Sequence, residues 1–290
     1  MHRTKFYIVL VAFLCIVTAC SKNNGNKSAG MQIKGSDTIV NLVQVWAEKF
    51  NKINNSTNIG VTGGGTGTGF AALLNNTCDI AMASRQVEEI EINLAKQKNI
   101  SYKEFTVGLD GLAVVVNKDK PVNNLTMEQL RDIFMSKIKN WKEVGGEDKQ
   151  IVLLSRESNS GTHMFFKEHV IRLNNPDSKD EFSPRALLMP SSQAIVDEIY
   201  QNSNALGYVG IGFISNQIKA LAVSEKDSNE FVFPTIENVM YRKYPISRPL
   251  YLYTNGEPSG IVKEFIDYTL SEEGQKVVSE TDFVPINIKK

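Results

Sequence analysis

An arginine and several hydroxyl side chains stand together in the stretch Ser155 to Phe166, SRESNSGTHMFF, directly before an apolar run that predicts a helix. Unpaired N–H groups and a partial positive charge at a helix start attract small oxyanions. Arg156 adds a permanently charged, forked donor, and Ser158, Ser160 and Thr162 add hydroxyls. The stretch therefore predicts an anion site, although Ser160 or Thr162 could equally be an ordinary helix cap.

A second stretch of this kind follows a predicted strand at residues 31–34. Gly35-Ser36-Asp37-Thr38 comes next, before a helical pattern with one apolar face, formed by Ile39, Val43, Trp46, Ala47 and Phe50. A strand, a hydroxyl-rich turn and a helix start thus recur in the same order. Ser36 or Asp37 could instead cap the helix.

A glycine-rich loop provides a third stretch. A predicted strand at residues 59–62 runs into Gly63–Gly69, GGGTGTG, and a helical pattern at Phe70 to Leu74 follows. Five glycines among seven residues allow the backbone to approach a ligand closely. No Lys-Ser/Thr pair follows, so the loop is not a nucleotide P-loop, and the context of a dinucleotide fingerprint is missing as well.

Ser84 and Arg85 follow a short apolar run at residues 79–83 that predicts a buried strand. Ligands of open α/β sheets gather at the carboxyl ends of the strands, so both residues are candidates for the site. The arginine could instead simply pair with a nearby carboxylate.

Composition and patterning indicate the fold class. The chain has 290 residues, long enough for one large domain or two smaller ones, and 32 basic residues balance 32 acidic ones, so no basic excess points to nucleic acid. Strand patterns alternate with helical ones, including an apolar run at Gly108–Asn117 and a helix capped by Thr126. This alternation predicts α/β layers.

The first residues have the features of a targeting signal. A basic start, an apolar run too short to span a membrane and the sequence Val17-Thr18-Ala19-Cys20 resemble a bacterial lipoprotein signal at residues 1–19. Cys20 would then carry lipid, and residues 20–30 would form a flexible tether; a plain secretory signal is the alternative. Only Cys78 would remain as a free thiol, which excludes an intrachain disulfide and favours a small core residue.

Three segments together resemble the phosphate-binding lipoproteins that feed phosphate ABC importers: GSDTIVNLVQVWAEKF, GGGTGTGFAALLNNTCDIAMASR and SRESNSGTHMFFKEHV. The likeness extends over residues 31–290. It implies an α/β fold of the type II periplasmic-binding-protein kind, in which two domains close over one phosphate. The implied first domain is 31–112 plus 247–290, and the second is 113–246. The chain would cross between them near 108–112 and 245–250.

The resemblance also implies a set of phosphate-binding residues. They are Ser36, Thr38, Thr66, Ser84, Arg85, Arg156, Ser160, Gly161 and Thr162. One position departs from the pattern, because Arg85 stands where well-known members have an aspartate that accepts the proton of hydrogen phosphate and so rejects sulfate. We take Asp37 as the candidate for this acceptor, with a helix cap as its alternative.

The resemblance implies a transport component, not an enzyme, with no cofactor, no metal and no nucleic-acid partner. Its expected partners are inorganic phosphate, the permease subunits of an ABC importer and, through the lipid, a bacterial cell membrane, so its expected location is extracytoplasmic, in the periplasm or on the outer surface. A monomer is the expected state. Binding of another tetrahedral oxyanion, sulfate or molybdate, is the nearest alternative. A secreted phosphatase is the second, and it would need a metal cluster or an activated nucleophile, which three histidines do not supply.

Overall fold

The structure is a computed structural model that describes residues 30–54, 58–225, 228 and 230–286. The chain divides into the segment Met1–Gly30 and a compact unit, Met31–Lys290. The predicted signal, Cys20 and all but the last residue of the predicted tether lie outside the described residues. All described strands and helices belong to the compact unit.

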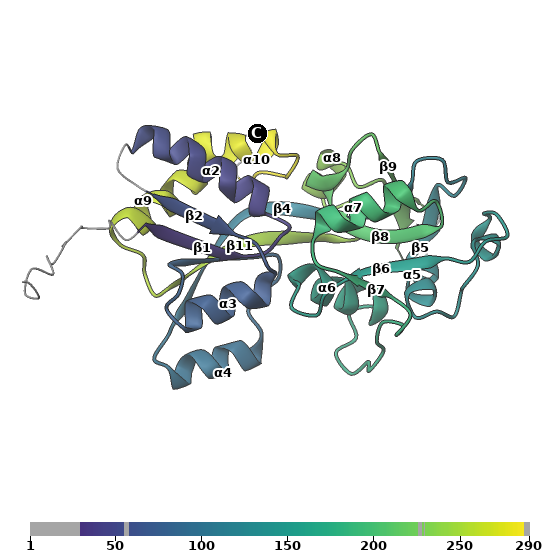
Figure 1. Ribbon diagram of the computed structural model, residues 1–290, viewed down its shortest axis with the longest axis horizontal. Helices are drawn as coiled ribbons and strands as arrows, with labels where there is room; N and C mark the ends of the chain where they lie inside the picture. Colours follow the sequence, from purple (N-terminus) through teal and green to yellow (C-terminus); the bar gives the residue numbers. More distant parts are fainter. Residues whose placement is uncertain (1–29, 55–57, 226–227, 229, 287–290) are drawn as a thin grey trace, which may run out of the picture. The chain divides into compact units, whose positions relative to one another are not determined.

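Strands and helices alternate along most of this unit, as the sequence pattern predicts (Figure 1). The described strands are β1 (Met31–Gly35), β2 (Ile59–Thr62), β3 (Ile80–Ala83), β4 (Tyr102–Asn117), β5 (Asn124–Thr126), β6 (Val152–Arg156), β7 (Leu187–Met189), β8 (Ala205–Gly210), β9 (Ile218–Ala220), β10 (Ala222–Ser224) and β11 (Ser247–Asn255). The main sheet has the order β2-β1-β3-β11-β4-β8-β6-β7, and β9 also pairs with β4. β5 and β10 form a small parallel sheet.

The helices pack around these strands. They are α2 (Val40–Ile53), α3 (Thr66–Leu74), α4 (Glu89–Gln97), α5 (Met127–Phe134), α6 (Gly161–Phe166), α7 (Ser192–Gln201), α8 (Ile236–Met240), α9 (Gly260–Leu270) and α10 (Glu272–Glu280). Three short irregular turns of helix complete them: η1 (Trp141–Val144), η2 (Lys167–Ile171), which continues α6, and η3 (Ile211–Phe213).

Strand β4 joins two groups of strands. Its residues 102–111 pair with β11, which pairs in turn with β3, and its residues 112–116 pair with β8. We call β2, β1, β3 and β11 the first strand group, and β8, β6 and β7 the second strand group. Figure 1 shows β4 and β11 extending from the first strand group towards the second. The domain boundaries implied by the resemblance fall within β4 and at the start of β11, and they stay a prediction.

Aromatic side chains form much of the core on both sides of β4. In the first strand group, Trp46 and Phe50 of α2 are buried, and Phe50 meets Phe265 of α9 edge to face with ring centres 5.4 Å apart. In the second, Phe166 stacks on Tyr208 with ring centres 4.0 Å apart. Cys78 is also buried, as its prediction as a core residue requires.

Local sequence signals place most of the predicted elements well, but the starts of two were wrong: β4 begins at Tyr102 and not at Gly108, and α3 also begins earlier than predicted. Thr126 caps α5 as predicted, because its hydroxyl accepts a hydrogen bond from the Gln129 N–H at 3.1 Å. The glycine-rich loop, however, gives way to α3 at Thr66 and not at Phe70, so two of its glycines are helical. Gly69 has a packing reason, since a Cβ there would lie 2.7 Å from the Lys34 carbonyl oxygen. Without a side chain, α3 can lie directly on β1.

Candidate functional site

The three predicted stretches and the end of β3 converge in the folded chain. β1 and β3 are parallel neighbours, so the turns that follow them leave the sheet at the same edge. The start of α3 and the start of α6 meet these turns. The hydroxyl residues that the structure brings together are all buried: Ser36, Thr38, Thr66, Ser84, Ser160 and Thr162. Ser158, by contrast, is exposed.

The closest contact in this hydroxyl cluster joins the two strand groups. The Thr38 hydroxyl, in the turn after β1, lies 2.8 Å from the Thr162 hydroxyl at the start of α6, although 124 residues separate them in sequence. Thr66 and Ser84 form the neighbouring part, where the Ser84 N–H donates to the Thr66 hydroxyl at 3.1 Å. Hydroxyls next to the first and the second strand group thus lie together in one small region.

Gly161 brings the start of α6 against this region. A Cβ at this position would lie 2.4 Å from the Thr66 hydroxyl oxygen and 2.8 Å from that of Ser84. Real Cβ atoms essentially never make such contacts, so any side chain here would displace these hydroxyls. The backbone of α6 therefore approaches the hydroxyls of the first strand group closely, which is the approach that an anion held by a helix start requires.

Arg156 and Asp37 form a second bridge between the strand groups. Nη2 of Arg156 donates to Oδ2 of Asp37 at 2.7 Å, and Oδ1 of Asp37 accepts the Gly64 N–H at 2.9 Å. The guanidinium also donates to the Ser192 hydroxyl and to two backbone carbonyls, those of Met189 and Pro190. Arg156 is thus buried with several partners, and Asp37 is one of them.

The helix-cap alternatives divide in the structure. α2 begins at Val40 with Ile39 in the cap position, and no side chain caps it, so neither Ser36 nor Asp37 has the alternative role of helix cap. The Ser36 hydroxyl instead accepts the Thr38 N–H at 3.2 Å. Ser160, by contrast, does cap α6, because its hydroxyl accepts the His163 N–H at 3.4 Å.

The Arg85 guanidinium is bound by a carboxylate that is not part of the hydroxyl cluster. Its two terminal nitrogens donate to the two carboxylate oxygens of Glu91, each at 2.8 Å, and one also donates to the Gln86 carbonyl. This is the carboxylate pairing that the sequence left open as an alternative. In the described structure none of the predicted site residues bonds to the Arg85 side chain, so its contact with a ligand stays a prediction.

A fully buried ion pair lies directly beside the hydroxyl cluster, and sequence reasoning missed it. Asp110 and Arg248 face each other on β4 and β11, and Oδ2 of Asp110 accepts hydrogen bonds from Nε and Nη2 of Arg248 at 3.0 and 2.8 Å. Complete burial raises the pKa of the Asp110 carboxyl, and the Arg248 guanidinium opposes that rise. A lone charge inside each of two apolar strand patterns was the available signal, since buried charges need a partner.

Arg248 connects this ion pair to both strand groups. Its Nη2 lies 3.3 Å from the Thr38 hydroxyl and 3.1 Å from the Thr162 hydroxyl, and its Nη1 donates to the Ser84 carbonyl at 3.1 Å. The guanidinium therefore contacts the turn after β1, the end of β3 and the start of α6. A charged donor with these contacts can hold an oxyanion between the two threonines.

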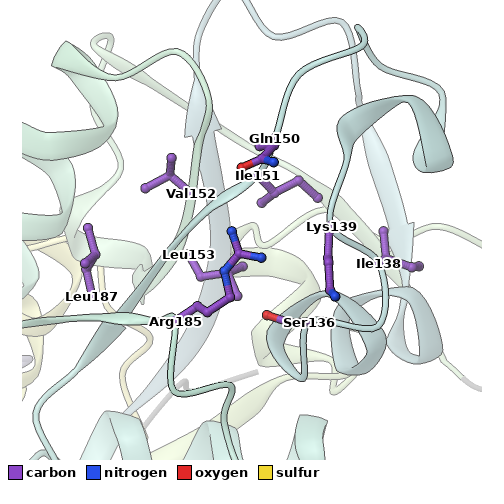
Figure 2. A pocket seen from close by; sticks show the side chains of 9 residues that line it. All are labelled: Ser136, Ile138, Lys139, Gln150, Ile151, Val152, Leu153, Arg185 and Leu187. Carbon is purple, nitrogen blue, oxygen red and sulfur yellow. The ribbon is translucent and has the colours of Figure 1, made fainter.

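Of two hollows in the surface, one borders the ion pair and the other lies elsewhere. One, of about 360 Å³, is lined by residues that include Arg248, Arg85, Phe165 and His169, so it borders the ion pair. The other, of about 160 Å³, lies between β6 and the segment after α5. Figure 2 shows Arg185 pointing into it, and none of the predicted site residues lines it.

Among residues 30–54, 58–225, 228 and 230–286, no group of three His, Cys, Asp or Glu side chains is placed to hold a metal ion. His163 is buried, which lowers the pKa of its imidazole to about 4, and its Nδ1 lies 3.2 Å from the Ser155 hydroxyl. That hydroxyl is itself buried against Tyr208 at 2.7 Å, away from the threonine pair.

No helix within the described part of the chain has the length and apolar character needed to cross a bilayer.

Comparison with known proteins gives consistent matches. A family model described as a PBP superfamily domain matches residues 21–273. The phosphate-binding protein PstS of Pseudomonas aeruginosa is 32% identical over 280 residues, covering 90% of this chain and 84% of that protein. PstS of Bacillus subtilis is 31% identical over 307 residues, covering 100% and 97%. A crystal structure with bound phosphate, of a Clostridium perfringens protein assigned as a phosphate ABC transporter substrate-binding protein, superposes with a TM-score of 0.79 at 31% identity, covering 89% of this chain and 100% of that one.

Proposed function

We propose that this chain, which belongs to the PBP superfamily and within it to the family of PstS phosphate-binding proteins, binds inorganic phosphate outside the cytoplasm and delivers it to an ABC importer. The family consists of substrate-binding proteins and not of enzymes. One observation of this chain carries the proposal. Thr38 and Thr162, from opposite strand groups, meet at 2.8 Å beside the Arg248 guanidinium.

The proposed ligand contacts follow from the donors around this point. A phosphate oxygen placed between Thr38 and Thr162 would replace their mutual hydrogen bond and accept from both hydroxyls and from Arg248. The other proposed donors are Ser36, Thr66, Ser84, Arg156, Ser160 and the backbone of Gly161. Hydrogen bonds to a charged group are worth about 1.5–3 kcal/mol each, so several of them can offset the cost of removing a dianion from water.

Asp37 has a supporting part in this proposal. Its carboxylate accepts one bond from Arg156 and one from Gly64, so it holds the arginine against the glycine-rich loop. Arg85 contributes to the wall of the adjoining hollow, where Glu91 fixes its guanidinium.

Delivery depends on closure of two domains over the anion. The proposed domains are residues 31–112 plus 247–290 and residues 113–246, with β4 and β11 carrying the chain between them. A phosphate that contacts both Thr38 and Thr162 binds best when the two domains are together. Binding therefore shifts the population towards the closed state, which the importer would recognise.

The N-terminal segment supplies the proposed anchor. A lipid on Cys20 and a tether of residues 20–30 would keep the binding unit near the membrane. From there, the unit could reach the permease subunits. We propose that the protein acts as a monomer. Mass spectrometry of protein purified from a bacterial membrane fraction would show the lipid mass on a chain beginning at Cys20, or else a chain without lipid.

Isothermal titration tests the proposed function. The protein is stripped of ligand by unfolding and refolding and is then titrated with phosphate, with sulfate and with molybdate. One-to-one binding of phosphate at submicromolar concentration is the expected result. Stronger binding of sulfate or of molybdate would mean that the chain transports that oxyanion and not phosphate. If none of the three anions binds, the proposal is wrong.

A further inference from the structure

We propose that Asp110, and not Asp37, is the carboxylate that lets this site distinguish a protonated tetrahedral oxyanion from an unprotonated one. The inference rests on the proposed function, because it concerns the same cluster of hydroxyls. Hydrogen phosphate has a hydroxyl group that can donate a hydrogen bond to a carboxylate, whereas sulfate has no such group. Since Arg85 stands at the position expected for the acceptor, another carboxylate must do this work if the chain selects phosphate.

Asp110 has a free acceptor position close to the cluster. Its Oδ2 is occupied by Arg248, but its Oδ1 accepts one hydrogen bond only, from the Ile211 N–H at 3.1 Å. A carboxylate oxygen can accept two, so one lone pair of Oδ1 remains available among the described contacts. The side chain is completely buried, so water does not compete strongly for this position.

Gly210 lies beside both Asp110 and the side chain of Thr38. A Cβ at this residue would lie 3.0 Å from Oδ1 of Asp110 and 3.0 Å from the methyl carbon Cγ2 of Thr38. Asp110 and the threonine pair are also close through Arg248, whose Nη2 lies 2.8 Å from Oδ2 of Asp110 and 3.3 and 3.1 Å from the two threonine hydroxyls. The φ angle of Gly210 is −61°, which any residue can adopt, so backbone conformation does not require glycine here.

Asp37 is less suited to the same role. Each of its oxygens accepts one hydrogen bond, from Gly64 and from Arg156, so acceptor capacity does not separate the two carboxylates, and the difference lies in their exposure to water. Its side chain is 13% exposed, whereas that of Asp110 is 0% exposed. Nearby water weakens repulsion between a carboxylate and an anion, so Asp37 discriminates less strongly.

The charges around Asp110 explain why a proton decides the outcome. Arg248 and Asp110 neutralise each other, so a dianion beside them gains hydrogen bonds from the cluster but little net attraction. If the ligand carries a proton, that proton forms a hydrogen bond to Oδ1 of Asp110. If it carries none, two negative oxygens face each other in a buried region, where repulsion is strong and the carboxylate is left without its donor.

Three variants test this assignment by titration with phosphate and with sulfate. In Asp110→Asn, we expect phosphate to bind more weakly and sulfate to bind more strongly, so that the ratio of the two affinities falls at least tenfold. In the matched control Asp37→Asn, both affinities fall together and their ratio stays within threefold of the wild-type ratio. Gly210→Ala places a methyl group between Oδ1 and Thr38 without changing any charge, and we expect it to lower the ratio as well.

The outcomes separate this inference from the proposed function. If the ratio is unchanged in Asp110→Asn, or is lost in Asp37→Asn instead, the assignment to Asp110 is wrong while phosphate transport stands. If wild type does not discriminate between the two anions, the assignment is also wrong. If wild type binds neither anion, the proposed function itself fails and the inference fails with it. Should Asp110→Asn not fold, Gly210→Ala decides, and an unchanged ratio in that variant overturns the assignment.

Discussion

Two arginine–aspartate pairs border the hydroxyl cluster, and different parts of the fold hold them together. Asp110 and Arg248 are opposite residues on neighbouring antiparallel strands, so the hydrogen bonds of the sheet fix their distance. Asp37 lies in the turn after β1 and Arg156 is the last residue of β6, and these strands are not neighbours in the sheet, so no strand pairing fixes their contact. A movement between the strand groups would separate the second pair and leave the first intact.

The surroundings of the two pairs agree with this difference. Around Asp37, the glycine-rich loop also touches the second strand group, since the Gly67 N–H donates to the Asn159 carbonyl at 2.9 Å and the Asn159 amide donates to the Gly64 carbonyl at 2.9 Å. In the proposed closing movement these contacts would form or break together. The pair on β4 and β11 would instead stay in place beside the proposed ligand. The pair at Asp37 would therefore change on closure, and the other pair would not.

We call Asp110–Arg248 the fixed pair and Asp37–Arg156 the conditional pair. The largest effect is expected from breaking the fixed pair. Asp110→Ala leaves the buried guanidinium of Arg248 without its counter-charge, and such a loss costs about 3–5 kcal/mol of folding free energy. Asp37→Ala is expected to cost clearly less, because Arg156 keeps its bonds to Ser192, Met189 and Pro190. Urea unfolding followed by circular dichroism measures both values.

A double variant is the control for this prediction. Replacing Arg248 with methionine in the Asp110→Ala background removes the unpaired charge and should recover a large part of the lost stability. Equal costs for Asp110→Ala and Asp37→Ala would remove the distinction between a fixed pair and a conditional one.

The next effect concerns binding at the conditional pair. Arg156→Ala removes a buried charged donor from the proposed ligand, at a cost of about 2–5 kcal/mol, so phosphate affinity should fall by more than tenfold. Calorimetric titration measures the change, and Arg131→Ala, at an arginine that pairs with Asp180, is the matched control with unchanged affinity. Unchanged phosphate affinity in Arg156→Ala would remove that arginine from the site.

Acid should weaken the surroundings of the conditional pair. Burial, the largest cause, lowers the pKa of His163 from 6.5 to about 4, so the unfolded chain binds more protons than the folded chain between these values. Stability from this residue is complete above about pH 6.5, falls as the pH drops towards 4 and does not change further below it. The loss is at most about 3 kcal/mol, at about 1.36 kcal/mol per pKa unit.

The variant His163→Gln isolates this contribution. Its unfolding free energy, measured in urea across the same pH range, should fall less steeply with acid than that of wild type. The pKa of His169 is also lowered, mainly by burial, so wild type and variant share the remaining slope. Parallel pH profiles for the two proteins would contradict the prediction.

The smallest effect is expected at Arg85. Because Glu91 holds its guanidinium through two bonds of 2.8 Å, Arg85→Ala should cost about 1 kcal/mol of stability and change phosphate affinity less than threefold. Unfolding and titration of the same variant measure both quantities. A loss of affinity above tenfold would show that Arg85 contacts the ligand. Arg85 would then be a third arginine of the site, beside Arg248 and Arg156.

Local sequence patterns were sufficient for the parts of the site that follow a strand and begin a helix. Ser36, Thr66 and Ser160 lie where a strand pattern, small polar residues and a helical pattern succeed one another. The parallel pairing of β1 with β3 then brings Ser36 and Ser84 to the same edge. These placements depend on neighbours in sequence and on a general property of α/β sheets, so a single sequence contains them.

The Asp110–Arg248 pair was not predictable in the same way. The two residues are 138 positions apart, and their contact depends on the register of two antiparallel strands. A charge in an apolar strand pattern shows that a partner is needed, but it does not say which residue is the partner. The direction of the Arg85 side chain has a similar cause, since it depends on where α4 places Glu91.

Because Cys78 is buried, the proposed closing movement can be followed with a fluorescent label on an introduced cysteine. Burial raises the pKa of this thiol to about 12, so almost none of it is the reactive thiolate at neutral pH. It is also the single cysteine between residues 30 and 286. A thiol introduced at the exposed Asn159, which touches the glycine-rich loop, can therefore be labelled selectively. A dye at that position would convert the protein into an optical sensor for its own ligand.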